Sequence, residues 1–375
     1  MDRLGVWLAL ALLGGLVVGA CQAPAAAPAA KSPAAPAALA AAPTSAPAAV
    51  APTAAPVAEP LKVRWGGQRT LTDAAAFVAL DRGYFREEGI DLDYVNFGSA
   101  SEIVPAVATN QLEVGGISPN PATLNALSRG LGIKLVGDRG VFRPGFGWIA
   151  LIVRTDLVDS GRYRTPADLR GLNVAITPPL GATANTVAMN RLLEREALAP
   201  DAVTFTPLSF GDMNPALTNR SIDAAFQSEP LLSVALAQGI AVKSVSSDEM
   251  YPNQQLGTVS YGSDFIRDHP DAARGFMVAY VRGIRDYYDA FLANRADPEP
   301  LAKFIADFAR LPNPDLVKRM YPVRFDPDGR VNADSIASDY QYFRATGDVT
   351  ADLDPRGLVD AQYTDYAVSR LGPYQ

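Results

Sequence analysis

The sequence predicts an α/β fold, because short apolar segments alternate with helix-like segments from residue 61 onward. Residues 90–95 alternate apolar and polar side chains, as a half-buried strand does. Residues 165–168 combine a capping threonine, a proline at the first helical position and an acid in the first turn, which indicates a helix start. Such an alternation is typical of mostly parallel sheets that helices cover on both faces.

The same patterns place the individual elements along the chain. We expect strands at residues 62–67, 90–95, 112–117, 133–136, 148–153, 172–176, 203–205, 224–226 and 242–245. We expect helices at residues 73–83, 101–107, 121–129, 181–196, 215–217, 230–238, 271–294, 298–310, 314–320 and 334–346. Aromatic residues recur at helical spacing after residue 271, and we assign them to the core.

Composition limits the possible functions. The formal net charge of −7 argues against nucleic-acid binding. The chain has one histidine, His269, and one cysteine, Cys21, so a His/Cys zinc site and a Ser-His-Asp triad are both disfavoured. We therefore expect no catalytic residues, no metal site and no cofactor.

The N-terminus predicts export and lipidation. One arginine, an apolar stretch and small residues up to residue 20 are the layout of a secretory signal peptide. Residues 18–21 read Val-Gly-Ala-Cys and resemble a bacterial lipobox, although Val18 stands where leucine is usual. We expect cleavage before Cys21 and a lipid on it that holds the protein on the extracytoplasmic face of the cell membrane. The alternative is an uncleaved membrane anchor, for which 17 apolar residues are marginal.

Residues 21–60 predict a lipid-anchored stalk. Alanine and proline make up 29 of the 39 residues from Gln22 to Pro60. Proline denies alanine the helix it would otherwise form, so we expect a semi-rigid, partly polyproline-II segment. The stalk would hold the folded body away from the membrane.

Five segments of the body resemble one family. The resemblance is to substrate-binding proteins of ABC importers, in the subgroup for nitrate, taurine, aliphatic sulfonates and the thiamine pyrimidine. It is carried by residues 79–92, 112–116, 165–175, 222–230 and 264–271 in their order and spacing. Together these segments extend over most of the body.

The resemblance implies a two-lobed periplasmic-binding-protein type II fold, with two crossover strands and extra C-terminal helices. Lobe one would comprise residues 61–153 plus 258–375, and lobe two residues 154–257. A small-molecule ligand would bind in the cleft, and the lobes would close on it by a hinge. The implied partners are an ABC permease and its ATPase, and we expect a monomer.

In parallel α/β lobes, ligands sit at the carboxyl ends of strands beside helix N-termini. This rule selects the loops that follow the predicted strands, together with the segment before the first crossover. The candidate ligand-binding residues are Trp65, Gln68, Arg69, Thr70, Ser99, Ser118, Asn120, Phe146, Trp148, Thr177, Gly181, Thr183, Gln227 and Glu229.

The candidate loops favour a heteroaromatic ligand over an anion. Residues 177–183 contain no lysine or arginine, and two prolines remove amide donors. Trp65, Phe146 and Trp148 could stack on flat rings, while Asn120, Gln227 and Glu229 could read ring amides. Our leading hypothesis is a vitamin or its precursor, with riboflavin and the thiamine pyrimidine as candidates. Core or hinge packing is the alternative role for each aromatic residue.

Other functions remain open. Nitrate, taurine or an aliphatic sulfonate is the alternative ligand. A distant alternative is a pyrimidine-synthesising enzyme that consumes a histidine, but His269 lies in an Asp-His-Pro sequence typical of a surface turn. A sensor or adhesin lipoprotein is a third possibility.

Overall fold

The computed structural model describes residues 59–98, 100–178, 180, 183–311 and 313–375. The expected signal peptide, the lipidation site Cys21 and the stalk up to residue 58 lie outside these ranges. The structural statements below concern the described residues.

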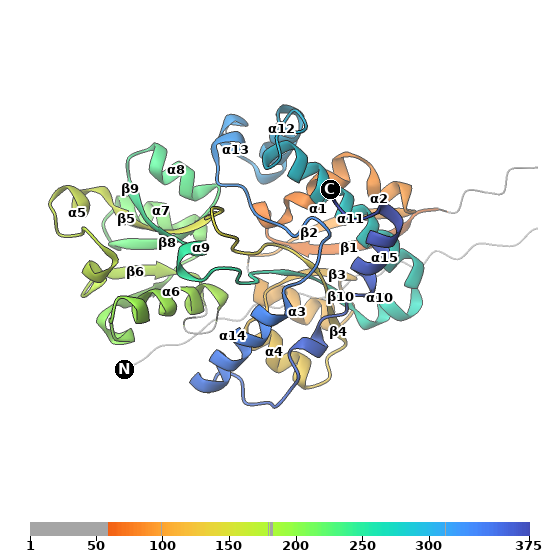
Figure 1. Ribbon diagram of the computed structural model, residues 1–375, viewed down its shortest axis with the longest axis horizontal. Coiled ribbons are helices and arrows are strands. Elements are labelled where there is room, and N and C mark those ends of the chain that lie inside the picture. Colours follow the sequence, from red (N-terminus) through yellow and green to blue (C-terminus); the bar gives the residue numbers. More distant parts are fainter. Residues whose placement is uncertain (1–58, 99, 179, 181–182, 312) are drawn as a thin grey trace, which may run out of the picture. The chain divides into compact units, whose positions relative to one another are not determined.

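Two five-stranded mixed sheets form the centres of two lobes (Figure 1). The first has the order β2-β1-β3-β10-β4 and the second the order β7-β6-β8-β5-β9. The strands of the first sheet are β1 (Leu61–Gly67), β2 (Ile90–Asn96), β3 (Val114–Ile117), β4 (Ile133–Asp138) and β10 (Thr258–Gly262). Those of the second are β5 (Ile149–Arg154), β6 (Asn173–Ile176), β7 (Thr204–Pro207), β8 (Ala224–Ser228) and β9 (Ala241–Ser246). These sheets and their helices confirm the predicted α/β fold.

Helices pack around both sheets. The first lobe contains η1 (Leu71–Asp73), α1 (Ala74–Asp81), α2 (Tyr84–Glu87), α3 (Ala100–Ala108) and α4 (Pro121–Ser128). The second contains α5 (Thr155–Asp159), η2 (Pro166–Leu169), α6 (Ala184–Arg195), η3 (Pro200–Ala202), α7 (Phe210–Thr218), α8 (Leu231–Ala237) and α9 (Ser247–Met250). After β10 follow α10 (Ser263–Asp268), α11 (Pro270–Phe291), α12 (Glu299–Ala309), α13 (Asp315–Arg319), α14 (Ala333–Thr346), η4 (Arg356–Leu358) and α15 (Gln362–Leu371).

Strand β5 differs from the expected division of the lobes. Residues up to 153 are expected in lobe one, but β5 pairs antiparallel with β8 and β9 in the second sheet. All six of its residues are buried, because it is a central strand and helices such as α8 and α9 pack against it. A continuous apolar run predicts such a central strand, but it does not say which of two sheets holds it.

Each sheet contains one strand that runs antiparallel to its neighbours. Two segments link the lobes. Residues 139–148 connect β4 to β5, and residues 247–257 connect β9 to β10. The two segments meet at a single antiparallel bridge between Val141 and Gln255. The expected crossovers correspond to these two segments, which also share backbone hydrogen bonds beside the bridge, and the second segment begins with α9.

Helix α11 organises the first lobe. Pro270 occupies the first turn of α11, where a missing amide hydrogen costs little. The apolar face of the helix is buried against α1, α2 and α15. Where α11 meets α1, Gly283 allows the two backbones to approach closely. A Cβ atom at this position would lie 2.1 Å from the carbonyl oxygen of Ala75.

The C-terminal region contacts both lobes. Helix α13 packs against α8 of the second lobe, and α14 packs against α4 of the first lobe and α6 of the second. Tyr340 and Phe343 of α14 share an apolar cluster with Leu124 of α4 and Val187 of α6. The C-terminal helices therefore join the lobes in addition to the two linking segments.

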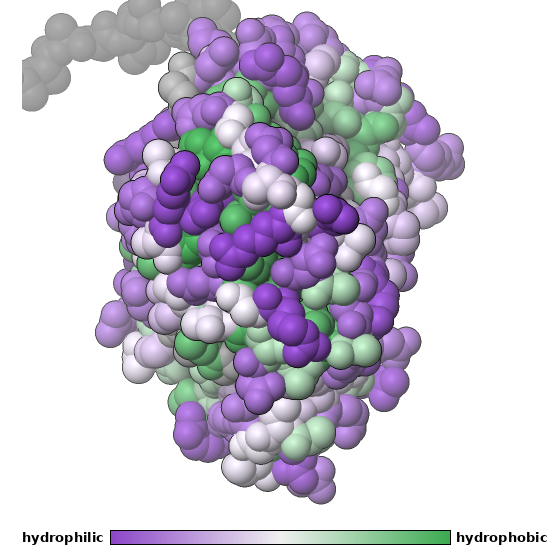
Figure 2. Space-filling view, turned by 90° about the vertical axis from the view of Figure 1, so that its left-hand side faces the viewer, coloured by the Kyte–Doolittle hydropathy of each residue, from purple (hydrophilic) through white to green (hydrophobic). Residues whose placement is uncertain are grey.

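Apolar side chains are mostly enclosed in this arrangement. Figure 2 shows a face on which hydrophilic residues predominate and hydrophobic residues occupy smaller areas between them. The large hydrophobic residues exposed in the described ranges are Leu131, Leu180 and Val242. No helix in these ranges combines the length and apolar character that crossing a membrane requires.

We predict that Gly283→Ala lowers the free energy of unfolding by about 1–3 kcal/mol, because the new methyl group overlaps the α1 backbone. Urea unfolding followed by circular dichroism measures this change. Gly275→Ala is the matched control in the same helix. Its methyl group would lie 3.0 Å from Glu88 Cβ and 3.1 Å from Glu88 Oε2, a much milder contact than the 2.1 Å at Gly283, so the gain in helix propensity should offset much of the crowding. Equal effects of both substitutions would contradict the proposed packing role of Gly283.

Candidate ligand-binding site

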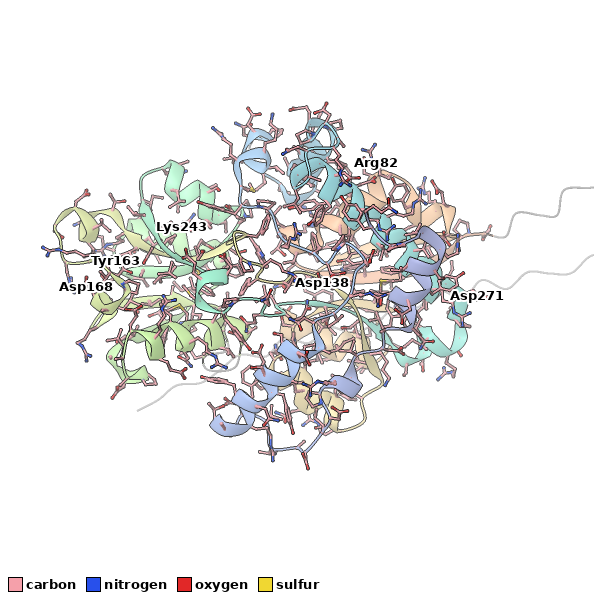
Figure 3. The ribbon with its side chains drawn as sticks, in the orientation of Figure 1. Arg82, Asp138, Tyr163, Asp168, Lys243 and Asp271 are labelled. Atoms are coloured by element: carbon pink, nitrogen blue, oxygen red, sulfur yellow. The ribbon has the colours of Figure 1, made fainter. Side chains whose placement is uncertain are left out.

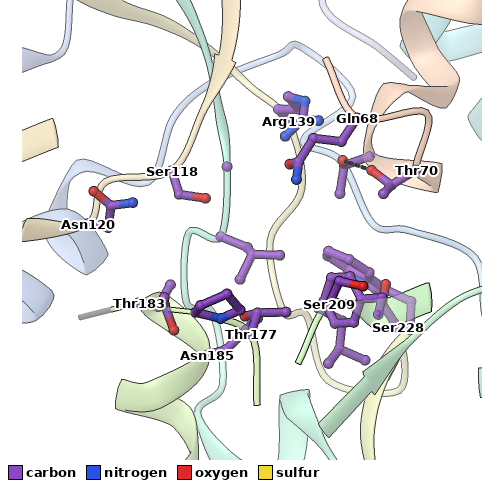
Figure 4. A pocket seen from close by; sticks show the side chains of 18 of the residues that line it. Gln68, Thr70, Ser118, Asn120, Arg139, Thr177, Thr183, Asn185, Ser209 and Ser228 are labelled. Carbon is purple, nitrogen blue, oxygen red and sulfur yellow. Dashed lines mark hydrogen bonds between the residues drawn. The ribbon is translucent and has the colours of Figure 1, made fainter. Parts of the chain in front are cut away.

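A cavity of about 160 Å³ lies between loops of the two lobes (Figure 4). Its walls come from segments at the carboxyl ends of parallel strands in both sheets and from the two linking segments. The lining residues are Gln68, Thr70, Thr72, Gly98, Ser118, Asn120, Arg139, Trp148, Ile149, Thr177, Pro178, Thr183, Ala184, Asn185, Ser209, Phe210, Ser228, Leu256 and Gly257.

The wall after β1 presents an amide and two hydroxyl groups. Thr70 and Thr72 hydrogen-bond to each other at 2.7 Å between their Oγ1 atoms. The backbone amide of Gln68 donates to the buried carboxylate of Asp73 at 3.1 Å, which fixes the turn. The Gln68 side chain has no hydrogen-bond partner in the described part of the chain, and it lies in the cavity wall (Figure 4). Its amide is therefore available to a ligand as both donor and acceptor.

The wall after β3 combines a free hydroxyl group with a helix cap. The side chain of Asn120 accepts a hydrogen bond from the Thr123 amide at 2.9 Å and so caps α4. Within the described residues, the Ser118 hydroxyl has no hydrogen-bond partner. Figure 4 shows both side chains on the same side of the cavity. Ser118 can thus serve a ligand without giving up an internal bond.

Arg139 forms the most polar part of the wall of the first lobe. Its side chain is only 3 % exposed, and its Nε donates to Asp73 Oδ1 at 2.8 Å. The Nη2 atom is buried and has no hydrogen-bond partner among the described residues. Figure 4 places Arg139 beside Gln68. The described lining residues include no other charged side chain, and Asp73 balances the charge of Arg139.

The second lobe contributes the N-terminus of α6. Thr183 caps this helix by accepting a hydrogen bond from the Thr186 amide at 3.1 Å. Asn185 donates to the Thr177 hydroxyl at 3.0 Å, while its Oδ1 is buried without a partner among the described residues. One acceptor of this wall is therefore left for a ligand or for water.

Two aromatic rings line the cavity. Trp148 is 1 % exposed and packs edge-on against Phe142, with ring centroids 5.4 Å apart. Its Nε1 is buried and has no partner among the described residues. Phe210 begins α7 beside Ser209, whose hydroxyl donates to Asp212 at 2.6 Å. The rings provide apolar surface, and Trp148 provides a further free donor.

Seven of the predicted ligand-binding residues line this cavity. They are Gln68, Thr70, Ser118, Asn120, Trp148, Thr177 and Thr183. Ser99 and Gly181 lie outside the described residues. The remaining five are placed elsewhere.

Three of these five belong to packing contacts outside the cavity. Trp65 is fully buried and stacks on Phe276 of α11 at 5.4 Å between centroids. Arg69 lies over the ring of Phe308 at 5.3 Å. Phe146 lies beneath the guanidinium of Arg324 at 4.8 Å. The ring-rich ligand pocket expected from the sequence is thereby reduced to Trp148 and Phe210.

Gln227 and Glu229 form hydrogen bonds with other residues of the protein. Gln227 is fully buried and donates to Asn214 at 2.9 Å. Glu229 accepts hydrogen bonds from the Ser233 hydroxyl at 2.7 Å and from the Tyr321 amide at 3.1 Å. Burial raises the pKa of Glu229. The Glu229–Tyr321 bond connects the second lobe to the C-terminal region.

Several lining residues are not among those predicted from the sequence, and Arg139 is the most consequential of them. Arg139 directly follows the carboxyl end of β4, so the rule that selects the other loops would also select this one. Asn185, Ser209 and Ser228 are similarly placed, at a helix start, after β7 and at the end of β8. No motif distinguishes these residues, but their position in the loops does.

Comparison with known proteins identifies the family. Residues 72–290 match the family described as NMT1/THI5 like. The chain belongs to this family, as the resemblance in its sequence predicts. No curated protein matches the chain.

Solved structures confirm the fold. A protein from Bordetella bronchiseptica RB50 aligns over 84 % of this chain and 98 % of its own, with a TM-score of 0.65 and 21 % identity. The alkanesulfonate-binding protein SsuA from Xanthomonas axonopodis pv. citri, bound to MOPS, aligns over 81 % and 100 %, with a TM-score of 0.61 and 18 % identity. The nitrate-binding protein NrtA from Synechocystis PCC 6803 aligns over 84 % and 90 %, with a TM-score of 0.65 and 12 % identity. The predicted periplasmic-binding-protein fold is confirmed.

A buried carboxyl group supports the cavity wall from behind. Asp339 of α14 is fully buried and accepts a hydrogen bond from Gln254 Nε2 at 3.0 Å. The same Nε2 donates to the carbonyl oxygen of Ala184, at the start of α6, at 3.0 Å. Burial raises the pKa of Asp339 to about 7, although the hydrogen bond from Gln254 and, to a smaller extent, the positive charge of Arg191 oppose this shift. Neither Oδ1 of Asp339 nor Oε1 of Gln254 has a hydrogen-bond partner among the described residues.

We predict that Asp339→Asn raises the free energy of unfolding at pH 8 by about 1–3 kcal/mol, because it removes a poorly satisfied buried charge. The gain should be smaller at pH 5. An unfolded aspartate loses its proton near pH 4, whereas folded Asp339 holds it to about pH 7. The free energy of unfolding of the wild type therefore falls as the pH rises from about 4 to about 7. Above about pH 7 it stays below its value at about pH 4.

Urea unfolding of both proteins at pH 5 and pH 8 measures this difference. Asp334→Asn, an exposed position in the same helix, is the control and should show little dependence on pH. An equal gain for Asp339→Asn at both pH values would contradict a proton bound by Asp339.

Proposed function

We propose that the protein is the substrate-binding component of an ABC importer, and that it captures a small heteroaromatic solute between its two lobes. The observation that carries the proposal is a single cavity lined from both sheets, in which the only charged side chain of the described lining is balanced by a buried partner. A permease and an ATPase would receive the solute. Membership of the family and the fold of its structural neighbours support this class of function.

The chemistry of the lining favours a neutral polar ring over a strong anion. Trp148 and Phe210 offer apolar surface to a flat ligand. Gln68 and Ser118 offer hydrogen bonds that can match the ring carbonyl and N–H groups of a flavin, or the ring nitrogens and amino group of an aminopyrimidine. A buried anion would need a positive charge of its own, and Asp73 already balances the charge of Arg139. A vitamin or vitamin precursor, such as riboflavin or the thiamine pyrimidine, fits this description.

A sulfonate or nitrate is the second candidate. One observation favours it, because Nη2 of Arg139 is a free, charge-assisted donor of the kind that oxyanions accept. Structural neighbours described as alkanesulfonate-binding and nitrate-binding proteins point in the same direction. The balanced charge of Arg139 places this candidate second.

Catalysis that consumes a histidine finds little support. His269 is exposed and precedes α11, and it is not among the residues that line the cavity. In the described part of the chain, no three or more histidine, cysteine, aspartate or glutamate residues gather as a metal site would require. We propose a binding protein that acts as a monomer and is not an enzyme.

The first test is a ligand panel of riboflavin, the thiamine pyrimidine, taurine, ethanesulfonate and nitrate. We expect a heteroaromatic member to raise the melting temperature and the anions to have little effect. A ligand present at 100 times its dissociation constant stabilises the protein by about 2.7 kcal/mol. Preferential stabilisation by ethanesulfonate or nitrate would reject the heteroaromatic assignment and retain the importer class.

Ser118→Ala should weaken binding of the best ligand about 5-fold, because one hydrogen bond contributes about 1 kcal/mol. Isothermal titration calorimetry measures the dissociation constant. Ser369→Ala, in α15 and outside the cavity lining, is the matched control and should bind as the wild type does. Unchanged binding by Ser118→Ala would place the ligand elsewhere.

We propose that lipid on Cys21 anchors the protein to the extracytoplasmic face of the cell membrane. A lipid-modified N-terminal cysteine carries two or more acyl chains, which suffices for stable anchoring. Cys21→Ser should therefore yield unprocessed or released protein that still binds its ligand. Membrane fractionation and ligand titration of the released protein measure the two properties. Loss of ligand binding would contradict the separation of anchor and binding body.

A further inference from the structure

The guanidinium of Arg139 is held by Asp73 and lies over two glycines. Its Nε donates to Asp73 at 2.8 Å, while the backbone amide of Arg139 donates to the carbonyl oxygen of Gly257 at 3.1 Å. A Cβ atom at Gly116 would lie 2.4 Å from Nε and 2.7 Å from Cζ. A Cβ atom at Gly257 would lie 3.3 Å from Nη1. The two glycines therefore leave the room that this side chain occupies.

Asp73 is the common hydrogen-bond acceptor of this arrangement. It is fully buried and receives donors from Arg139, from the Gln68 amide at 3.1 Å and from the Tyr94 hydroxyl at 2.9 Å. Burial and the charge of Asp73 raise the pKa of Tyr94 above its ordinary value, so Tyr94 remains a donor. Arg139 and Asp73 together thus form a neutral pair next to the cavity.

Two buried donors in the cavity wall have no acceptor among the described residues. One is Nη2 of Arg139 and the other is Nε1 of Trp148. Leaving a buried donor unsatisfied costs about 1–3 kcal/mol, so native proteins rarely do so without a ligand or water to accept the bond. Both donors require the same complement, an acceptor atom.

We propose that Arg139 donates through Nη2 to a carbonyl oxygen of the ligand, and that its pairing with Asp73 makes the site select a neutral, carbonyl-bearing ring over an anion. This inference rests on the proposed function and names the ligand chemistry that the site reads. An anion bound here would add net negative charge to a buried, neutral pair, which is costly in a low-dielectric environment. A ring carbonyl satisfies the donor without this cost.

The probes are riboflavin, whose ring system carries carbonyl oxygens, the thiamine pyrimidine, which has an amino group and no ring carbonyl, and ethanesulfonate. We expect the wild type to bind riboflavin at least about 10-fold more tightly than either of the others, the difference that one charge-assisted hydrogen bond gives. Quenching of flavin fluorescence measures riboflavin binding, and calorimetry measures the other two.

The double variant Asp73→Asn/Arg139→Gln replaces the ion pair by a neutral pair, which avoids an unpaired buried charge. It should unfold cooperatively and lose at least about 10-fold in riboflavin affinity. Asp334→Asn/Arg356→Gln, which removes an exposed ion pair, is the matched control and should keep the affinity. Asp73→Asn alone leaves the charge of Arg139 unbalanced, so the affinity ratio of ethanesulfonate to riboflavin should rise at least about 10-fold.

The outcomes separate the inference from the proposed function. Riboflavin binding that the double variant retains, or a wild type that prefers the thiamine pyrimidine, overturns the role of Arg139 and leaves the heteroaromatic importer intact. A wild type that binds no heteroaromatic probe overturns both. If the double variant fails to fold, the affinity ratio in Asp73→Asn decides: an unchanged ratio overturns the inference.

Discussion

The structure depends on a buried hydrogen-bond network between Asp138 and Gln255, which joins three segments that are far apart in the sequence. Asp138 accepts hydrogen bonds from Gln255 Nε2 at 2.6 Å, from the Gly140 amide at 2.7 Å and from the Asp326 amide at 2.6 Å. Gln255 Oε1 accepts from the Asn332 amide at 2.7 Å. Figure 3 shows Asp138 between the two lobes. Burial raises the pKa of Asp138 to about 7. Both linking segments and the C-terminal region are thereby fixed at the end of β4.

This network and the ligand cavity use consecutive residues. Asp138 bonds the linking segments, while Arg139 lines the cavity and pairs with Asp73. On the other segment, Gln255 belongs to the network, and Leu256 and Gly257 line the cavity. A change in the arrangement of the lobes must pass through these segments, so it would also move the residues that line the cavity. In the proposed function, this covalent geometry would couple ligand capture to lobe closure.

The sequence predicts the fold well because local patterns determine it. Periodicity, caps and prolines locate most strands and helices, and the carboxyl-end rule finds loops from both lobes. The errors concern the direction in which a side chain points. At the carboxyl end of β8, the prediction selects Gln227 and Glu229, but Ser228 lines the cavity, since successive residues of an extended chain face opposite sides.

Other site residues depend on contacts that no local pattern reveals. Trp65 lies in a strand that ends in glycines, as a ligand contact could, but Phe276, far along the chain, covers its ring. The sequence does not distinguish Arg139 from other polar residues that follow a strand. Its role depends on the contact with Asp73, which lies 66 residues earlier in the chain. A buried ion pair contributes little to stability on its own, because desolvation offsets the attraction between its charges. The position of this ion pair beside the cavity is therefore better explained by ligand recognition than by folding. The pair holds a strong hydrogen-bond donor in a fixed place without net charge, and a neutral ligand can accept a hydrogen bond from that donor.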